Sequence, residues 1–294
     1  MIKHDFNKLL LPIIASVMLM TGCSLNEKPS QLEATSQVEI ETTTQTEPTE
    51  SSEQLSKAYF DALNTGAFTL EDQINWLYTN LDQLSTDQAS KVLMAFEEAH
   101  INTAFELMEK LYVKGSSEPV KSVSDEVLSL GYKLEPVEGS LNIIIDYGFY
   151  DPFLSNISED VAAFYKLMKV ESEEVPLKDA GIVITWHELF KRALSWETFT
   201  KQFPDSDLTD RAKDMLSGYL DWSFNGAPNS PVFDWDQNRL TDTYKQGIES
   251  FLSEAEQSSF VNEMRLFYQL IQKNDYTNNA EIESVQKKYL RVFD

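Results

Sequence analysis

The chain has 294 residues, and its 24 Lys and Arg face 48 Asp and Glu, a formal net charge of -24 at pH 7. Such a charge repels phosphate backbones and anionic lipid headgroups, so we expect no nucleic-acid partner and no direct electrostatic adhesion to a membrane. Soluble cations and basic partners fit this composition better. The length is sufficient for one large hydrophobic core.

The N-terminus has the pattern of a bacterial secretory signal. A basic head precedes a mostly apolar run, Leu9 to Met20, and the small Gly22 leads to Cys23, the only cysteine. The run is too short for a typical spanning helix. A cysteine directly after a small residue is typical of a lipobox, which predicts a signal peptide over residues 1–22 and a lipid on Cys23. A plain secreted protein with an incidental cysteine is the alternative.

Lipid on Cys23 would make the bilayer itself a partner. The sequence therefore predicts a protein anchored to the cell membrane, on the extracytoplasmic face of a Gram-positive bacterium. An acylated cysteine leaves no thiol for a disulfide, a zinc site or a nucleophile, and we expect no cofactor and no metal. Residues 23–54 are rich in Ser, Thr and Glu, a composition that predicts a disordered tether.

Helical periodicity begins at Leu55 and predicts a mainly α domain over residues 55–294, a multi-helix array or bundle. Thr69 with Asp72, and Ser85 with Gln88, have the spacing of capping boxes at two helix starts. His100, in an acidic helix, is expected at the surface or half-buried. The acidic run of Glu171, Glu173 and Glu174 is expected to be a solvated loop.

Residues 132–146 predict one β-hairpin within this helical domain. Two β-branched runs flank Gly139-Ser140, which is typical of a type II′ turn. The corresponding register pairs Glu138 with Leu141 and places Glu138 and Asp146 on opposite faces. A glycosidase needs both carboxyls on one side of its sugar, so we expect Asp146 to form an ion pair with Lys133 instead.

Two motifs begin like metal sites and then fail. His187-Glu188 opens like a zinc-protease motif, but Lys191 stands where the second histidine is needed. The run Asp234 to Asn238 begins like a calcium loop, but Arg239 replaces the required Gly and Lys245 the bidentate Glu. We expect an Asp- and Asn-rich turn there, and we predict no catalytic residue.

Aromatic residues are concentrated between Glu138 and Phe233 and just beyond. Rings with a few polar groups are typical of sites that stack sugars or peptides, whereas rings at helical spacing are more often core. Both interpretations stay open here. The candidate binding residues of this region are Glu138, Asp146, Tyr147, Trp186, Trp222 and Asn229.

Two resemblances follow from specific segments. Phe203-Pro204-Asp205-Ser206 with the later Ala212 resembles the inter-helix corner of tetratricopeptide-like repeats, although no second copy follows at a 34-residue offset. The segment order from Glu138 to Phe233 resembles uncharacterised helical lipoproteins of Gram-positive bacteria. The matching pieces include Glu138-Gly139, Asp146-Tyr147, Glu171-Ser172, Lys178-Asp179-Ala180, Trp186 with Glu188, and Asn229-Ser230-Pro231.

The second resemblance implies a helical lipoprotein and carries no catalytic residue. We therefore expect a binding or scaffolding module at the cell envelope, with an envelope protein or glycan as its partner. The alternative is a cell-envelope hydrolase of peptidoglycan or polysaccharide with an unrecognised acidic site. Two inward carboxylates about 5–9 Å apart in a cleft would favour that hydrolase.

Overall fold

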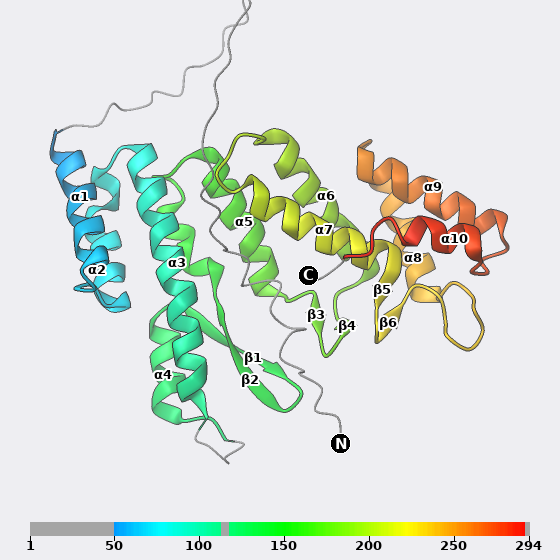
Figure 1. Ribbon diagram of the computed structural model, residues 1–294, viewed down its shortest axis with the longest axis horizontal. Coiled ribbons are helices and arrows are strands. Elements are labelled where there is room, and N and C mark those ends of the chain that lie inside the picture. Colours follow the sequence, from blue (N-terminus) through cyan, green and yellow to red (C-terminus); the bar gives the residue numbers. More distant parts are fainter. Residues whose placement is uncertain (1–49, 113–117, 292–294) are drawn as a thin grey trace, which may run out of the picture.

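The computed structural model describes residues 50–112 and 118–291, and this part of the chain is mainly helical, as the sequence predicts. Figure 1 shows an elongated molecule with α1 and α2 at one end and α9 and α10 at the other. The predicted signal peptide, Cys23 and most of the predicted tether lie outside the described residues. Within them, every helix is too short or too polar to span a bilayer.

The first helices are α1 (Glu50–Asn64), α2 (Leu70–Asn80), the 3-10 turn η2 (Leu81–Gln83), α3 (Thr86–Leu111) and α4 (Lys121–Ser129). The capping boxes predicted at Thr69 and Ser85 are confirmed: both hydroxyls accept from the third backbone amide of their helix, and the returning side-chain bonds are present. These caps satisfy amides that would otherwise be unpaired at the helix starts. The sequence thus locates both helix starts correctly.

The first helix begins earlier than the periodicity predicts. It starts at Glu50 rather than Leu55, so residues 50–54 of the predicted tether are helical. The buried Ser52 explains the extension, because its hydroxyl bonds Gln88 and accepts from the Ser85 amide at 3.0 Å. The first turn of α1 is therefore held against the start of α3 by polar bonds, which a search for apolar periodicity cannot detect.

The hairpin consists of β1 (Tyr132–Val137) and β2 (Ser140–Ile145), within the predicted range, but its turn differs. Val137 pairs with Ser140, which makes Glu138-Gly139 the two-residue turn, and both have positive φ, 47° and 79°. This is the type I′ signature, so the predicted II′ turn and its pairings are wrong. Because the shift is two residues, the apolar face is preserved.

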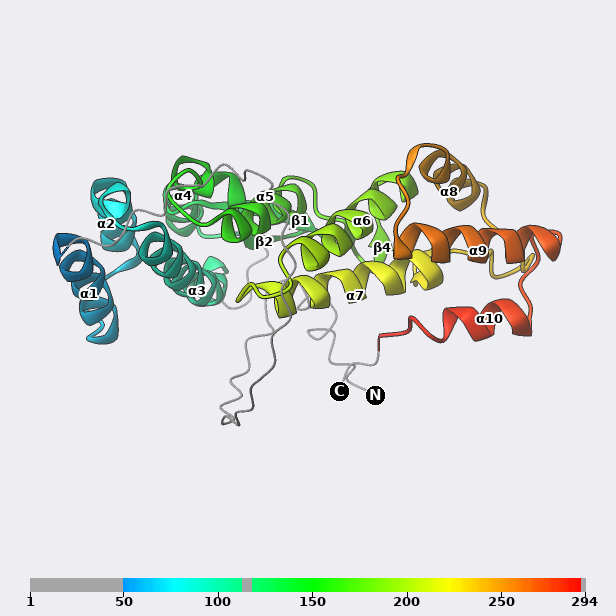
Figure 2. The same ribbon diagram turned by 90° about the horizontal axis from the view of Figure 1, so that it is seen from above.

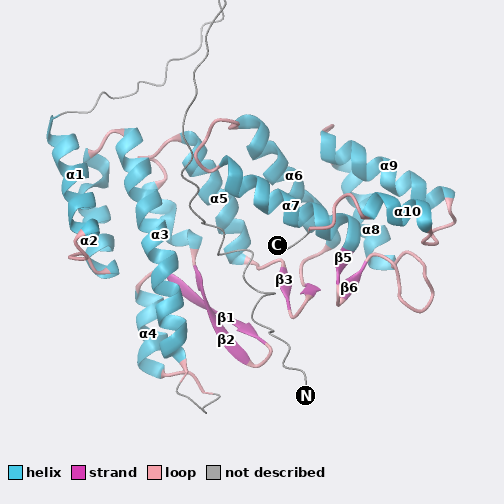
Figure 3. Cartoon of the chain, viewed as in Figure 1, coloured by secondary structure: helices cyan, strands magenta, loops and turns pink. Residues whose placement is uncertain are grey.

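Two further strand pairs were not predicted. They are β3 (Leu177–Lys178) with β4 (Gly181–Ile182), and β5 (Gly226–Ala227) with β6 (Ser230–Pro231). Each strand has two residues, too few for a period-2 pattern to be visible in the sequence. The turns of all three hairpins point towards one edge of the molecule, the lower edge in the view of Figures 1 and 3, with α4 beside the first hairpin.

The remaining helices are η3 (Tyr147–Phe153), α5 (Glu159–Glu173), α6 (Trp186–Gln202), α7 (Thr209–Asn225), α8 (Asp242–Glu254), α9 (Ser259–Lys273) and α10 (Ala280–Gln286). Figure 2 shows α6 and α7 side by side in the middle of the array. Ala212 is completely buried on α7, as expected of a small residue between close helices. The last helix ends before the predicted residue 293.

The corner between α6 and α7 differs in detail from its prediction. Phe203 is the C-cap of α6, and Leu208, not Asp205 or Ser206, is the N-cap of α7. Ser206 still satisfies an amide, since its hydroxyl accepts from the Leu208 N–H at 3.2 Å and donates to Asp160 on α5. α7 therefore starts after one additional turn, and the hydroxyl of Ser206 in that turn bonds the Leu208 amide.

Candidate functional site

The candidate site is the edge formed by the three hairpin turns, here called the hairpin edge: Glu138, Lys178, Asp179, Asn229 and Ser230, with Glu135. Lys178 forms an ion pair with Glu135, which joins the second hairpin to the first. Asn229 donates its Nδ2 to the Asp179 carbonyl at 2.6 Å, which joins the third hairpin to the second. Three segments distant in sequence thus meet at one edge.

Backbone bonds reinforce the contact between the second and third hairpins. The Asn229 amide donates to the Ala180 carbonyl at 2.9 Å, and the Ile182 amide donates to Ser230 Oγ at 3.0 Å. Gly181 is buried at this contact, and the hairpins approach so closely that a Cβ on Gly181 would lie only 3.3 Å from the Asn229 Cβ. The hairpin edge is therefore a connected structure and not three independent loops.

Two carboxyl groups meet on the exposed part of this edge. Hydrogen bonding to Asp179, together with repulsion between the two charges, raises the pKa of Glu138. Both side chains come from turn residues with positive φ, so the turn geometry delivers them to the surface. The Glu138 and Asp179 carboxyls are suited to share a proton between them or to accept hydrogen bonds from a ligand.

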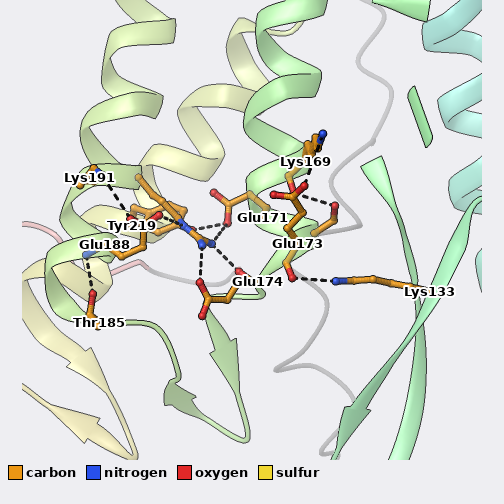
Figure 4. Close-up of polar contacts among 11 residues, drawn as sticks. Lys133, Lys169, Glu171, Glu173, Glu174, Thr185, Glu188, Lys191 and Tyr219 are labelled. Carbon is orange, nitrogen blue, oxygen red and sulfur yellow. Dashed lines mark hydrogen bonds and ion pairs between the residues drawn. The ribbon is translucent and has the colours of Figure 1, made fainter. Parts of the chain in front are cut away.

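A buried carboxylate, Glu171, lies in the last turn of α5, among the side chains drawn in Figure 4. Its Oε1 accepts from Trp196 Nε1 at 2.9 Å, and its Oε2 accepts from Arg192 Nη1 at 3.3 Å and from the Tyr219 hydroxyl. Burial raises the pKa of Glu171, and the bonds from Tyr219, Arg192 and Trp196 act against that rise. The expected solvated loop is therefore wrong for Glu171.

Arg192 connects Glu171 to the exposed acids around it. The guanidinium donates to the Glu174 carbonyl at 2.7 Å and to Glu188 Oε1 at 3.0 Å. Glu173 and Glu174 are exposed, as expected, but Glu173 is the last residue of α5 and does not lie in a loop. The arrangement ties α5 to α6 and α7, with every polar contact of Glu171 made inside the protein. Its chemistry is that of a structural ion pair.

The six predicted binding residues do not form one site. Glu138 and Asn229 both reach Asp179 and belong to the hairpin edge. Trp222 is half-buried beside a small hollow that Pro176, Gly218 and Tyr219 also line. The other three candidates lie elsewhere in the fold.

Asp146, Tyr147 and Trp186 serve the structure. Asp146 caps η3 by accepting from the Gly148 amide at 3.0 Å, so the expected ion pair with Lys133 is not formed. Lys133 instead lies near Glu135, with 3.8 Å between Nζ and Oε2. Tyr147 and Trp186 are buried, and Trp186 packs on Tyr244 with ring centroids 4.8 Å apart. For these rings, the core interpretation is the correct one.

The expectation for His100 is wrong, because the side chain is completely buried on α3. Its Nδ1 lies 3.0 Å from the Tyr150 hydroxyl, and its ring packs on Tyr132 at 4.2 Å between centroids. Burial lowers the pKa of His100 to about 3, so the imidazole is neutral at pH 7. The other expected turn is confirmed, since Asp234 Oδ1 accepts from the amides of Asp236 and Gln237.

In the part of the chain that the structure describes, no three His, Cys, Asp or Glu side chains gather as metal ligands. No family model matches the chain, and comparison with curated proteins and with solved structures found no match. The site is therefore interpreted from its own chemistry alone.

Proposed function

We propose that this protein is a lipid-anchored binding or scaffolding module on the extracytoplasmic face of a bacterial membrane. The observation that carries the proposal is the apolar run that ends in Gly22-Cys23, followed by a Ser-, Thr- and Glu-rich segment. Acyl chains on Cys23 would provide the membrane contact that an acidic protein cannot obtain from its charge. The resemblance to uncharacterised helical lipoproteins supports the same proposal.

The folded region supports binding rather than hydrolysis. Two of its buried carboxylates, Glu97 and Glu171, are held by arginine and tyrosine side chains that link separate helices. The exposed carboxyls of Glu138 and Asp179 lie on neighbouring turns, beside the amide of Asn229. Such a surface offers acceptors and one amide to an envelope protein or glycan, and we assign the hairpin edge this role.

The anchor is tested by metabolic labelling with palmitate in a Gram-positive host. Cys23→Ala is expected to abolish the label and to release the protein from the membrane fraction. Ser24→Ala, the adjacent control, is expected to keep both. Persistent labelling of Cys23→Ala would show that the lipid is not on this thiol.

The role of the hairpin edge is tested by placing a photo-crosslinking amino acid at Asn229 in the same host. We expect adducts with an envelope component at Asn229 and none at Leu128, which is also exposed, at 60%, on α4. Equal adducts at both positions, or none at either, would contradict the assignment of this edge.

A further inference from the structure

We propose that the loop of residues 233–240, here called the Trp235 loop, docks a cationic peptide segment, with a Lys or Arg side chain stacked on the Trp235 indole beside Asp236. The loop connects β6 to α8 and projects at the end of the hairpin edge (Figure 1). This inference extends the proposed binding function to a second surface and rests on that function.

Trp235 is the most exposed large apolar side chain of the described residues, at 78%. The other tryptophans are buried or half-buried. A tryptophan in water forgoes the largest burial that any side chain offers, about 25 cal/mol for each Å². A ring displayed in this way is typical of the residues that dominate binding energy in protein interfaces.

The loop is braced from within. Asp234 donates its amide to the Arg239 carbonyl at 2.8 Å and accepts from the Asn238 amide at 2.9 Å. Its side chain also fixes the backbone on the far side of Trp235, through the amides of Asp236 and Gln237. Trp235 is therefore flanked on both sides by backbone that is already ordered, which reduces the entropy lost when a partner binds.

A second loop, residues 274–278 between α9 and α10, braces the first from outside. The Asn278 amide donates to the Asn238 carbonyl at 3.0 Å, and Asn238 Nδ2 donates to the Asn278 carbonyl at 3.1 Å. The Leu240 amide donates to the Tyr276 carbonyl at 2.8 Å. The two loops thus form one rigid support for Trp235.

Both loops contain backbone in the left-handed region. Asn238, Asp275 and Tyr276 have φ of 54°, 51° and 59°. Asn and Asp tolerate this region, but for a bulky Tyr it is an outlier, of the kind that clusters at binding sites. The support is therefore built at a conformational cost.

Charge selects the partner. Asp234 and Asp236 flank Trp235 in the sequence of a chain whose net charge is -24. The two neighbouring cations each have a partner: Arg239 Nη1 lies 3.4 Å from Thr277 Oγ1, and Lys245 Nζ lies 4.3 Å from the Tyr276 ring centroid. A cation over an indole face is attracted by the ring, and adjacent carboxylates add to that attraction. The acidic chain opposes insertion of the ring into anionic lipid, and a neutral glycan would make no use of the two aspartate charges.

The test uses fluorine NMR of the full chain labelled with 5-fluorotryptophan, in which the Trp235 resonance is assigned by its loss in Trp235→Phe. The probe is a hexa-arginine peptide, and neutral chitohexaose is the comparison ligand. We expect the peptide to shift the Trp235 resonance saturably, and chitohexaose to leave it unchanged. Asp236→Asn is expected to raise the peptide Kd about threefold, the effect of one exposed ion pair.

Asp205→Asn is the matched control, because it removes the same charge at the α6–α7 corner, far from the Trp235 loop in Figures 1 and 2. It is expected to leave the Kd unchanged. If Asp236→Asn and Asp205→Asn raised the peptide Kd equally, the binding would depend on net charge alone, and the proposed site would be overturned. The site would also be overturned if the Trp235 resonance shifted with chitohexaose but not with the peptide, or with neither ligand. A shift of another tryptophan alone would overturn this site but leave the binding function standing.

Discussion

Arg211 on α7 forms a bidentate ion pair with Glu97 on α3, with Nη1 2.7 Å from Oε2 and Nη2 2.8 Å from Oε1. Tyr147 and Tyr165 donate their hydroxyls to the same carboxylate at 2.6 and 3.3 Å. The guanidinium also lies over the Phe164 ring, 4.7 Å from its centroid. One buried carboxylate thus joins α3, η3, α5 and α7.

Removal of one partner of this pair should be costly. Arg211→Met leaves the Glu97 charge buried without its cation, and we expect a loss of about 3–5 kcal/mol in the free energy of unfolding. The double variant Arg211→Met with Glu97→Gln should lose less than the sum of the two single variants, because their effects share one interaction. Chemical denaturation of the four proteins measures this coupling, and strictly additive losses would contradict it.

Stability should depend on pH through His100. Its folded pKa, about 3, lies below the unfolded value of 6.5, so the unfolded chain binds the proton more readily between these values. Stability is therefore lost as pH falls below 6.5, by about 2 kcal/mol at pH 5. His100→Gln cannot titrate, and its own denaturation midpoint should fall less between pH 7 and 5 than that of the wild type. Identical losses in the two proteins would exclude His100 as the cause.

Gly139, in the first hairpin turn, and Gly226, the first residue of β5, can be compared because both have positive φ. Gly226 and Gly139 have nearly equal φ, 77° and 79°, but a Cβ at Gly226 would lie 2.5 Å from the Ser230 carbonyl oxygen, and one at Gly139 would meet nothing within 4 Å. Gly139→Ala should cost about 1 kcal/mol for the left-handed backbone alone. Gly226→Ala should cost clearly more, because a Cβ there clashes with backbone and because the Gly226 ψ of -157° lies in a region that is essentially restricted to glycine. Equal melting temperatures of the two variants would refute the close contact.

The exposed carboxyl pair gives a local pH prediction. Because hydrogen bonding and charge repulsion from Asp179 raise the pKa of Glu138, Asp179→Asn should lower that pKa towards its ordinary value. Carbon-detected NMR titration of the Glu138 carboxyl measures the change. Asp275→Asn, a turn aspartate of the 274–278 loop with a similar positive φ, is the control and should leave the Glu138 titration unaltered.

Ala212 tests the packing of α6 against α7. The side chain is completely buried, and Ala212→Leu should cost about 1–3 kcal/mol through overpacking. The exposed neighbour Lys213, changed to the same residue, should lower the melting temperature much less. Near-wild-type melting of Ala212→Leu would mean that the helices have room at this position.

The helical class, both capping boxes and the hairpin range could be predicted because they depend on local spacing. The hairpin register could not, since Glu138-Gly139 and Gly139-Ser140 are both acceptable turns and only tertiary contacts decide between them. The buried acids had a signal that was missed. Glu171 continues the spacing of Phe164 and Met168, a helix face that is buried.

The candidate site was predictable only in part. Glu138 and Asn229 were identified, but their common neighbour Asp179 lies in a strand pair too short to leave a pattern. Trp235, just beyond Phe233, belongs to the aromatic-rich region of the sequence, but it lies within the Asp-rich turn that keeps it at the surface. Ring content alone does not distinguish a core residue from a displayed one.

The bond between Glu97 and Arg211 also sets an order for folding during synthesis. These residues are 114 positions apart, so at about 5–20 residues per second Arg211 is added roughly 6–23 s after Glu97. During that interval the Glu97 carboxylate on α3, which is buried in the folded protein, has no Arg211 to pair with. The N-terminal helices therefore cannot reach their final packing before α7 is made, and a nascent chain that stops short of Arg211 would keep α3 exposed to chaperones and proteases.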